Sequence, residues 1–164
     1  MPIAAGVDAP DFRLPASEGE ARSLSSFAGS PVVLAFFKTS CGTCQTTFPV
    51  WGSLEQRFRG TAPVVAVAQD AMQPARTWLE ERGFEGLVLN DSYNAYAASA
   101  AYEVQAVPTL VLIDGDGVVV EAIEGWSRDA ANGFAHRLSA LTGGVGGDEP
   151  LSTAADGLPA HKPG

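Results

Sequence analysis

The sequence has few basic residues, no long hydrophobic run and only two cysteines. Its 164 residues include 10 Lys and Arg against 19 Asp and Glu, a formal charge of −9. An acidic chain offers no basic surface for the phosphates of a nucleic acid or for an anionic membrane. The longest apolar stretch, residues 31–37, is far shorter than the roughly 20 residues that cross a bilayer. We therefore expect no nucleic-acid partner and no membrane span.

The N-terminus also lacks an export signal. Residues 1–8 contain no Lys or Arg followed by a long apolar block, so they do not read as a signal peptide. The expected location is the cytoplasm. An exported protein whose native leader had been replaced by Met1 would show the same sequence, and this alternative stays open.

The length and composition predict one folded domain with loose ends. An apolar fraction of 46% is too high for a disordered chain, and two cysteines are too few for a disulfide-stapled scaffold. From Gly143 onward the chain is rich in Gly and Pro and has few large apolar groups, so it cannot offset the entropy of ordering. We expect a folded unit over residues 9–142, a flexible N-terminus over 1–8 and a flexible tail over 143–164.

Strand and helix signals alternate along the folded unit. Because alternating strands and helices form a largely parallel sheet with helices on both faces, the pattern predicts an α/β fold. Asp-Gly-Asp-Gly at 114–117 adds an antiparallel hairpin near the end, which makes the expected sheet mixed. The expected strands are 32–37, 64–68, 87–89, 109–113 and 118–120, and the expected helices are 41–59, 73–83, 92–102 and one capped by Ser127 or Asp129.

Cys41 and Cys44 form a C-x-x-C pair, a spacing that two randomly placed cysteines would show only ~1% of the time. In a reducing compartment a structural disulfide is disfavoured, which leaves redox catalysis, metal binding or coincidence. Zinc normally takes four ligands, and the only histidines are His136 and His161. We therefore expect no metal site.

The buried strand, the C-x-x-C at a helix start and a later Val-Pro-Thr together resemble the thioredoxin superfamily. Residues 36–44 look like its strand and active-site turn, and Pro49 stands where thioredoxins kink the helix. Val-Pro-Thr at 107–109 matches the cis-proline loop. Residues 9–15 and 23–29 are similar to the N-terminal extension of peroxiredoxins and of TlpA/ResA-type thiol:disulfide oxidoreductases. The resemblance implies a thioredoxin fold, a central mixed sheet flanked by helices with an N-terminal extension.

Dithiol exchange without a bound cofactor is the activity that this resemblance implies. We expect Cys41 to attack a disulfide as the thiolate and Cys44 to resolve the mixed disulfide. At the helix start, free N–H groups and the helix dipole would favour a negative charge on Cys41. Lys38 would add a cation if its ammonium turned toward the sulfur, and Thr43 offers an N–H and a hydroxyl able to reach a sulfur.

The same resemblance places Pro108 in cis against the cysteine pair. A cis bond there would point the carbonyl and N–H of Val107 outward, where an extended partner peptide could pair with them. The expected partner is a disulfide-containing protein or a small thiol. The sequence does not identify the electron donor.

Two acids that commonly serve as proton acceptors in these families are absent. Ala35 stands six residues before the first cysteine, and Thr47 stands three residues after the second. The proton acceptor stays open among water, Lys38 and a residue such as Asp70.

Two alternatives remain beside the oxidoreductase. Peroxiredoxins place Thr three residues and Pro seven residues before the peroxidatic cysteine, whereas Lys38 and Leu34 occupy these positions here. This departure favours the oxidoreductase over a thiol peroxidase. A non-catalytic binding module on a thioredoxin scaffold is the other alternative.

Overall fold

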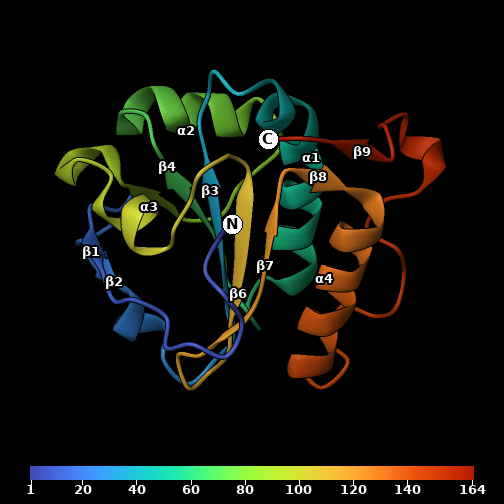
Figure 1. Ribbon diagram of the computed structural model, residues 1–164, viewed down its shortest axis with the longest axis horizontal. Coiled ribbons are helices and arrows are strands. Elements are labelled where there is room, and N and C mark those ends of the chain that lie inside the picture. Colours follow the sequence, from blue (N-terminus) through green and yellow to red (C-terminus); the bar gives the residue numbers. More distant parts are fainter.

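A five-stranded mixed sheet runs through the centre of the molecule, and the computed structural model describes residues 1–164 (Figure 1). The strand order is β5-β4-β3-β6-β7, in which β3, β4 and β5 are parallel and β6 and β7 are antiparallel to their neighbours. This arrangement confirms the predicted α/β fold and its late hairpin. The strands are β3 (Val32–Phe37), β4 (Val64–Ala68), β5 (Val88–Asn90), β6 (Thr109–Ile113) and β7 (Val119–Glu124).

The central strand β3 is buried along its whole length because both faces of the sheet are covered. Its odd-numbered residues join a core with α1 (Gly42–Phe58), α2 (Met72–Glu80) and α4 (Arg128–Leu141). Its even-numbered residues face α3 (Ala97–Ala101) and the N-terminal extension. Alternation along one strand therefore supplies both halves of the core.

The predicted helix over residues 92–102 is shorter in the structure. Ala95 and Tyr96 have φ values of 51° and 62°, so the backbone is left-handed just before the helix begins. The buried carboxylate of Asp91 accepts hydrogen bonds from the N–H groups of Ala98 and Ser99, at 2.9 and 2.8 Å. Because this carboxylate binds the free N–H groups of the first turn, the helix starts at residue 97.

The N-terminal segment is attached to the domain rather than loose. Ile3 is buried, Asp8 forms a β-bridge with Val118, and the Gly6 N–H donates to the Val119 carbonyl at 2.8 Å. Further along, β1 (Arg13–Leu14) and β2 (Arg22–Ser23) form a small hairpin.

The C-terminal segment also differs from the expected flexible tail. Its strand β9 (His161–Lys162) pairs antiparallel with β8 (Trp126–Ser127), which precedes α4. Ser152 is buried and exchanges two hydrogen bonds of 2.9 Å with the Asn132 side chain. Composition alone misses this arrangement because backbone pairing and polar contacts, rather than apolar area, hold the segment in place.

No helix of the structure has both the length and the apolar character that crossing a bilayer requires.

Candidate functional site

The cysteine pair lies where β3 passes into α1. Cys41 is the N-cap of α1, and its sulfur accepts a hydrogen bond from the Cys44 N–H at 3.1 Å. Cys41 is partly exposed, whereas Cys44 is completely buried within the core beneath it. Both are free thiols. A partner can therefore reach the Cys41 sulfur and not the Cys44 sulfur.

Burial also separates the two cysteines chemically. The pKa of the Cys44 thiol is raised well above its ordinary value, chiefly because burial disfavours the thiolate and next because of its hydrogen bond with Cys41. Cys44 consequently stays protonated at neutral pH. The N–H bond to the Cys41 sulfur, by contrast, stabilises a negative charge on that atom.

The loop before β6 meets the exposed cysteine. The peptide bond between Val107 and Pro108 is cis, and Pro108 is buried. The Cys41 thiol donates to the Val107 carbonyl with an S–O distance of 3.2 Å. Thr109 fixes the same loop, because its hydroxyl donates to the Ala106 carbonyl at 2.7 Å. The two segments identified by motif therefore come together in space.

Lys38 and Thr43 do not act on the sulfurs as expected. The Lys38 side chain is exposed and its ammonium has no hydrogen-bond or ion-pair partner, although its carbonyl accepts from the Cys41 N–H at 3.1 Å. The Thr43 hydroxyl donates to the Pro163 carbonyl at 2.6 Å rather than to a sulfur. A role of Thr43 in stabilising the thiolate stays a prediction. Its backbone neighbour, the Cys44 N–H, makes the bond to the sulfur instead.

The positions that lack an acid remain neutral in the structure. Ala35 is fully buried in β3, and the buried Thr47 hydroxyl donates to the Thr43 carbonyl at 2.8 Å. Asp70, at the end of β4, accepts from the Thr39 N–H at 2.7 Å. None of the hydrogen bonds of Asp70 reaches a cysteine, so its visible role is to hold the loop that precedes Cys41.

Sequence reasoning missed the last residues of the chain, which lie at the site. The Lys162 ammonium is 3.4 Å from the Gly42 carbonyl and 3.2 Å from the Thr46 hydroxyl. Gly164 packs so closely on the Val107 carbonyl that a Cβ would come within 2.7 Å of its oxygen. No local signal predicts this placement, because the partner of Thr43 is 120 positions away along the chain.

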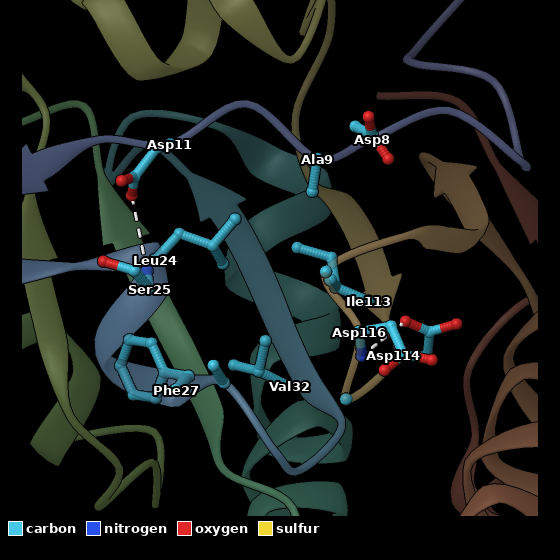
Figure 2. A pocket seen from close by; sticks show the side chains of 13 residues that line it. Asp8, Ala9, Asp11, Leu24, Ser25, Phe27, Val32, Ile113, Asp114 and Asp116 are labelled. Carbon is cyan, nitrogen blue, oxygen red and sulfur yellow. Dashed lines mark hydrogen bonds between the residues drawn. The ribbon is translucent and has the colours of Figure 1, made fainter.

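A separate cavity of about 440 Å³ lies at the other end of the sheet (Figure 2). It opens between the N-terminal extension and the β6–β7 hairpin, beside Val32 at the start of β3. Because Cys41 follows the opposite end of β3, this cavity is not part of the cysteine site. Its acidic side chains are Asp8, Asp11, Asp114 and Asp116.

Comparison with known proteins agrees with the chemistry of the cysteine site. The model of the AhpC/TSA family matches residues 5–122. The chain is 30% identical over 121 residues to the thioredoxin-like protein YneN of Bacillus subtilis (strain 168), covering 71% of this chain and 69% of that protein. It is 29% identical over 125 residues to the thiol-disulfide oxidoreductase ResA of the same organism, covering 75% of this chain and 69% of the relative.

A solved structure gives the same result for the fold. A Chlorobium tepidum protein, provisionally assigned as the thiol:disulfide interchange protein DsbE, superimposes with a TM-score of 0.75 and 30% identity. The match covers 85% of this chain and 99% of that one.

Proposed function

Because the chain belongs to the AhpC/TSA family and is a TlpA/ResA-like thiol:disulfide oxidoreductase of the thioredoxin superfamily, we propose that Cys41 attacks and Cys44 resolves. The observation that carries this assignment is the asymmetry of the two sulfurs. Cys41 is partly exposed, and its sulfur accepts a hydrogen bond from the Cys44 N–H. Cys44 is buried, and burial keeps it protonated by raising its pKa. Only Cys41 can meet a disulfide on a partner.

The first step forms a mixed disulfide. The Cys41 thiolate attacks one sulfur of the substrate disulfide, so that the bond between the two substrate sulfurs breaks and one leaves as a thiolate. We expect the substrate backbone to approach the Val107 carbonyl, because that oxygen lies 3.2 Å from the attacking sulfur.

The second step releases the reduced substrate. Cys44 gives up its proton, attacks the Cys41 sulfur and forms the Cys41–Cys44 disulfide. The substrate sulfur bound to Cys41 leaves, and the two substrate thiolates take up the protons from the two cysteines. Two electrons thus pass to the substrate. A separate dithiol donor must return them before another cycle.

Disulfides on extended polypeptides are the proposed substrate class. The contact between Cys41 and the loop at Val107 and Pro108 supports this choice, because a carbonyl and N–H at such a loop suit pairing with an extended strand. A small disulfide would use the sulfur contact alone.

The assignment is tested with single cysteine variants in an insulin-reduction assay supplied with a dithiol donor. Cys41→Ser should abolish the reaction, whereas Cys44→Ser should stop it after the first step and accumulate a mixed disulfide visible by mass spectrometry. Ser53→Ala, on the exposed side of α1, is the matched control and should retain full activity. If Cys41→Ser kept the activity and Cys44→Ser lost it, the two roles would be reversed.

The peroxidase alternative is not better supported, because two positions before Cys41 depart from the peroxiredoxin pattern. Leu34, at one position where peroxiredoxins carry a pocket residue, is fully buried in the middle of β3. Lys38, at the other, is exposed and has no contact with a cysteine through its side chain.

A further inference from the structure

The last seven residues of the described chain lie across the cysteine site. We call residues 158–164 the C-terminal strap. In Figure 1 this segment, drawn in red, crosses from the side of α4 toward the start of α1, with the C-terminus beside that helix. The strap is linked to α4 by residues 142–157, which follow the helix, so it reaches the site within its own molecule.

The strap is held first by the edge of β8. Strand β9 pairs antiparallel with β8, so that Trp126 lies opposite Lys162 and Ser127 opposite His161. The Trp126 indole N–H donates to the Pro159 carbonyl at 2.7 Å, and the Arg128 N–H donates to the Ala160 carbonyl at 2.9 Å. An extended segment added to a strand edge is how many proteins bind peptides.

Beyond β9 the strap lies on the catalytic elements themselves. The Pro163 carbonyl accepts from the Thr43 hydroxyl between the two cysteines, and Lys162 reaches the Gly42 carbonyl at the first turn of α1. Gly164 rests on the Val107 carbonyl, the same oxygen that accepts from the Cys41 thiol. The strap thus occupies backbone positions that an extended substrate would need.

A glycine on the domain side makes this close approach possible. Gly125 precedes β8 with φ of +69°, and a Cβ there would lie 2.9 Å from the Gly164 nitrogen and 3.1 Å from the Lys162 carbonyl oxygen. The strap and the domain therefore fit one another at the level of backbone atoms.

We propose that the C-terminal strap is a tethered pseudosubstrate, which polypeptide disulfides must displace before they reach Cys41. This inference rests on the proposed function and adds to it a discrimination between polypeptide disulfides and small disulfides. Cys41 keeps part of its surface exposed beside the strap. A small disulfide can therefore react with the strap in place, whereas an extended chain cannot.

The strap is suited to being displaced. Its residues are small or exposed, apart from the partly buried Leu158 and Lys162, and they include two prolines and a glycine. Its hold on residues 42, 43, 46 and 107 consists of hydrogen bonds and backbone packing, each of modest net strength. If the strap is open about one tenth of the time, it weakens the apparent affinity for a competing peptide about tenfold.

The test compares two substrates on three forms of the protein. Deletion of residues 161–164 removes β9 and the contacts at the cysteines, while Leu158 and the Pro159 and Ala160 carbonyls keep their partners. We expect this deletion to raise kcat/KM for insulin about tenfold. Its kcat/KM for 2-hydroxyethyl disulfide should stay within about twofold of the full chain, since that substrate does not compete with the strap.

Lys162→Ala provides a second variant that keeps the backbone pairing of β9 with β8. It removes only the ammonium contacts with Gly42 and Thr46, so it should raise insulin reduction in the same direction and by less. Glu149→Ala is the matched control in the same C-terminal region, because only the backbone carbonyl of Glu149 makes a contact, with Arg57. It should leave both rates unchanged.

A synthetic peptide of residues 161–164, added in excess to the deletion variant, should inhibit insulin reduction and spare the small disulfide. A scrambled peptide should do neither. If the full chain, the deletion and Lys162→Ala reduced insulin at equal rates and all three were active on the small disulfide, the proposal that the strap competes with polypeptide substrates would be contradicted. Absence of activity on both substrates in all forms would instead contradict the proposed function.

Discussion

At the scale of single residues, burial gives Cys44 a pH dependence that affects the stability of the whole domain. Its pKa is raised from the ordinary value of 9.0, mainly by burial. The folded protein therefore keeps this proton at pH values where the unfolded chain has lost it. Because protonation and folding are linked, the contribution of the buried thiol to the free energy of unfolding is fully present below pH 9.0. It declines as the pH rises above that value.

We predict that the reduced protein loses stability above pH 9.0 more steeply than Cys44→Ala does. The difference in slope should approach about 1.4 kcal/mol per pH unit, the value for one proton. Urea unfolding at several pH values, with a reductant present, measures both slopes. Tyr102, whose pKa burial also raises, is common to both proteins and cancels in the comparison. Parallel curves for the two proteins would contradict the prediction.

Substitutions of Asp70 can distinguish a role in positioning the loop from a role in proton transfer. Its carboxylate accepts the Thr39 N–H, just before the cysteines, and touches neither sulfur. We predict that Asp70→Ala destabilises the protein by about 1 to 2 kcal/mol and slows insulin reduction, because the N–H loses its acceptor. Asp70→Asn keeps an acceptor oxygen and should retain most of the activity.

The pH profile of insulin reduction decides whether Asp70 positions the loop or moves a proton. A positioning role requires Asp70→Asn to follow the same pH profile as the original protein. Loss of activity in Asp70→Asn equal to that in Asp70→Ala would show that the charge itself is needed.

At the scale of elements, the placement of α1 depends on a close approach to the chain between α2 and β5. Gly52 in α1 faces the Gly83 carbonyl, and a Cβ at residue 52 would lie 2.6 Å from its oxygen. In α4, by contrast, a Cβ at Gly133 would meet nothing within 4 Å. The same substitution in these two helices should therefore have opposite effects.

We predict that Gly52→Ala destabilises the protein by about 1 to 3 kcal/mol, since backbone atoms must shift. Gly133→Ala should stabilise it by about 0.5 to 1 kcal/mol through helix propensity alone. Chemical denaturation of both variants measures the two changes in the free energy of unfolding. A stabilising Gly52→Ala would mean that α1 is less tightly packed than the structure shows.

The elements that the sequence predicts well are those fixed by local signals. The run at 32–37 and the N-cap Ser127 specify β3 and the start of α4 within a few neighbouring residues. The short α3 shows the opposite case, because Asp91 caps it from outside the alanine-rich segment. A pattern of helix-forming residues cannot show that a carboxylate seven and eight positions before Ala98 and Ser99 will bind their N–H groups and set the first turn.

At the scale of the whole molecule, two segments of the site can be predicted from the sequence, whereas the C-terminal strap cannot. The cysteine pair and the segment at Val107 and Pro108 are each marked by a short motif, and the fold joins them. No motif marks the strap, because Gly, Pro and Ala carry no periodicity and its hydrogen bonds reach residues 33 and 120 positions away along the chain. Its position depends on β8 and α4 being already in place.

The strap is anchored by a polar cluster whose charge can be removed with acid. The Asp156 carboxylate accepts from the Ser152 hydroxyl and from the Leu158 N–H, and it lies 3.5 Å from the Arg128 guanidinium. These contacts, the Ser152 hydrogen bond foremost, hold the pKa of Asp156 below its ordinary value of 3.8. Docking supported by this carboxylate is therefore complete above pH 3.8 and is lost as pH falls through the lowered pKa.

We predict that acid releases the strap through Asp156, and the Trp126 indole N–H reports this release. That N–H is bonded to the Pro159 carbonyl, whereas those of Trp51 and Trp78 have no partner, so its NMR signal is distinct among the three. In the original protein the signal should hold its position until the pH falls below 3.8. In Asp156→Asn it should already be shifted at neutral pH toward the position that the original protein shows in acid, because the charge on the anchor is gone.

Asp148→Asn is the matched control for this experiment, because Asp148 is exposed in the same region and its nearest ion-pair partner is His136 at 3.7 Å. Its indole signal should behave as in the original protein. If Asp156→Asn kept the original signal at neutral pH and shifted at the same acid pH, the release would depend on other groups. The strap would then be held by β8 and the cysteine turn alone, and its opening would be set by competition with substrate rather than by its anchor.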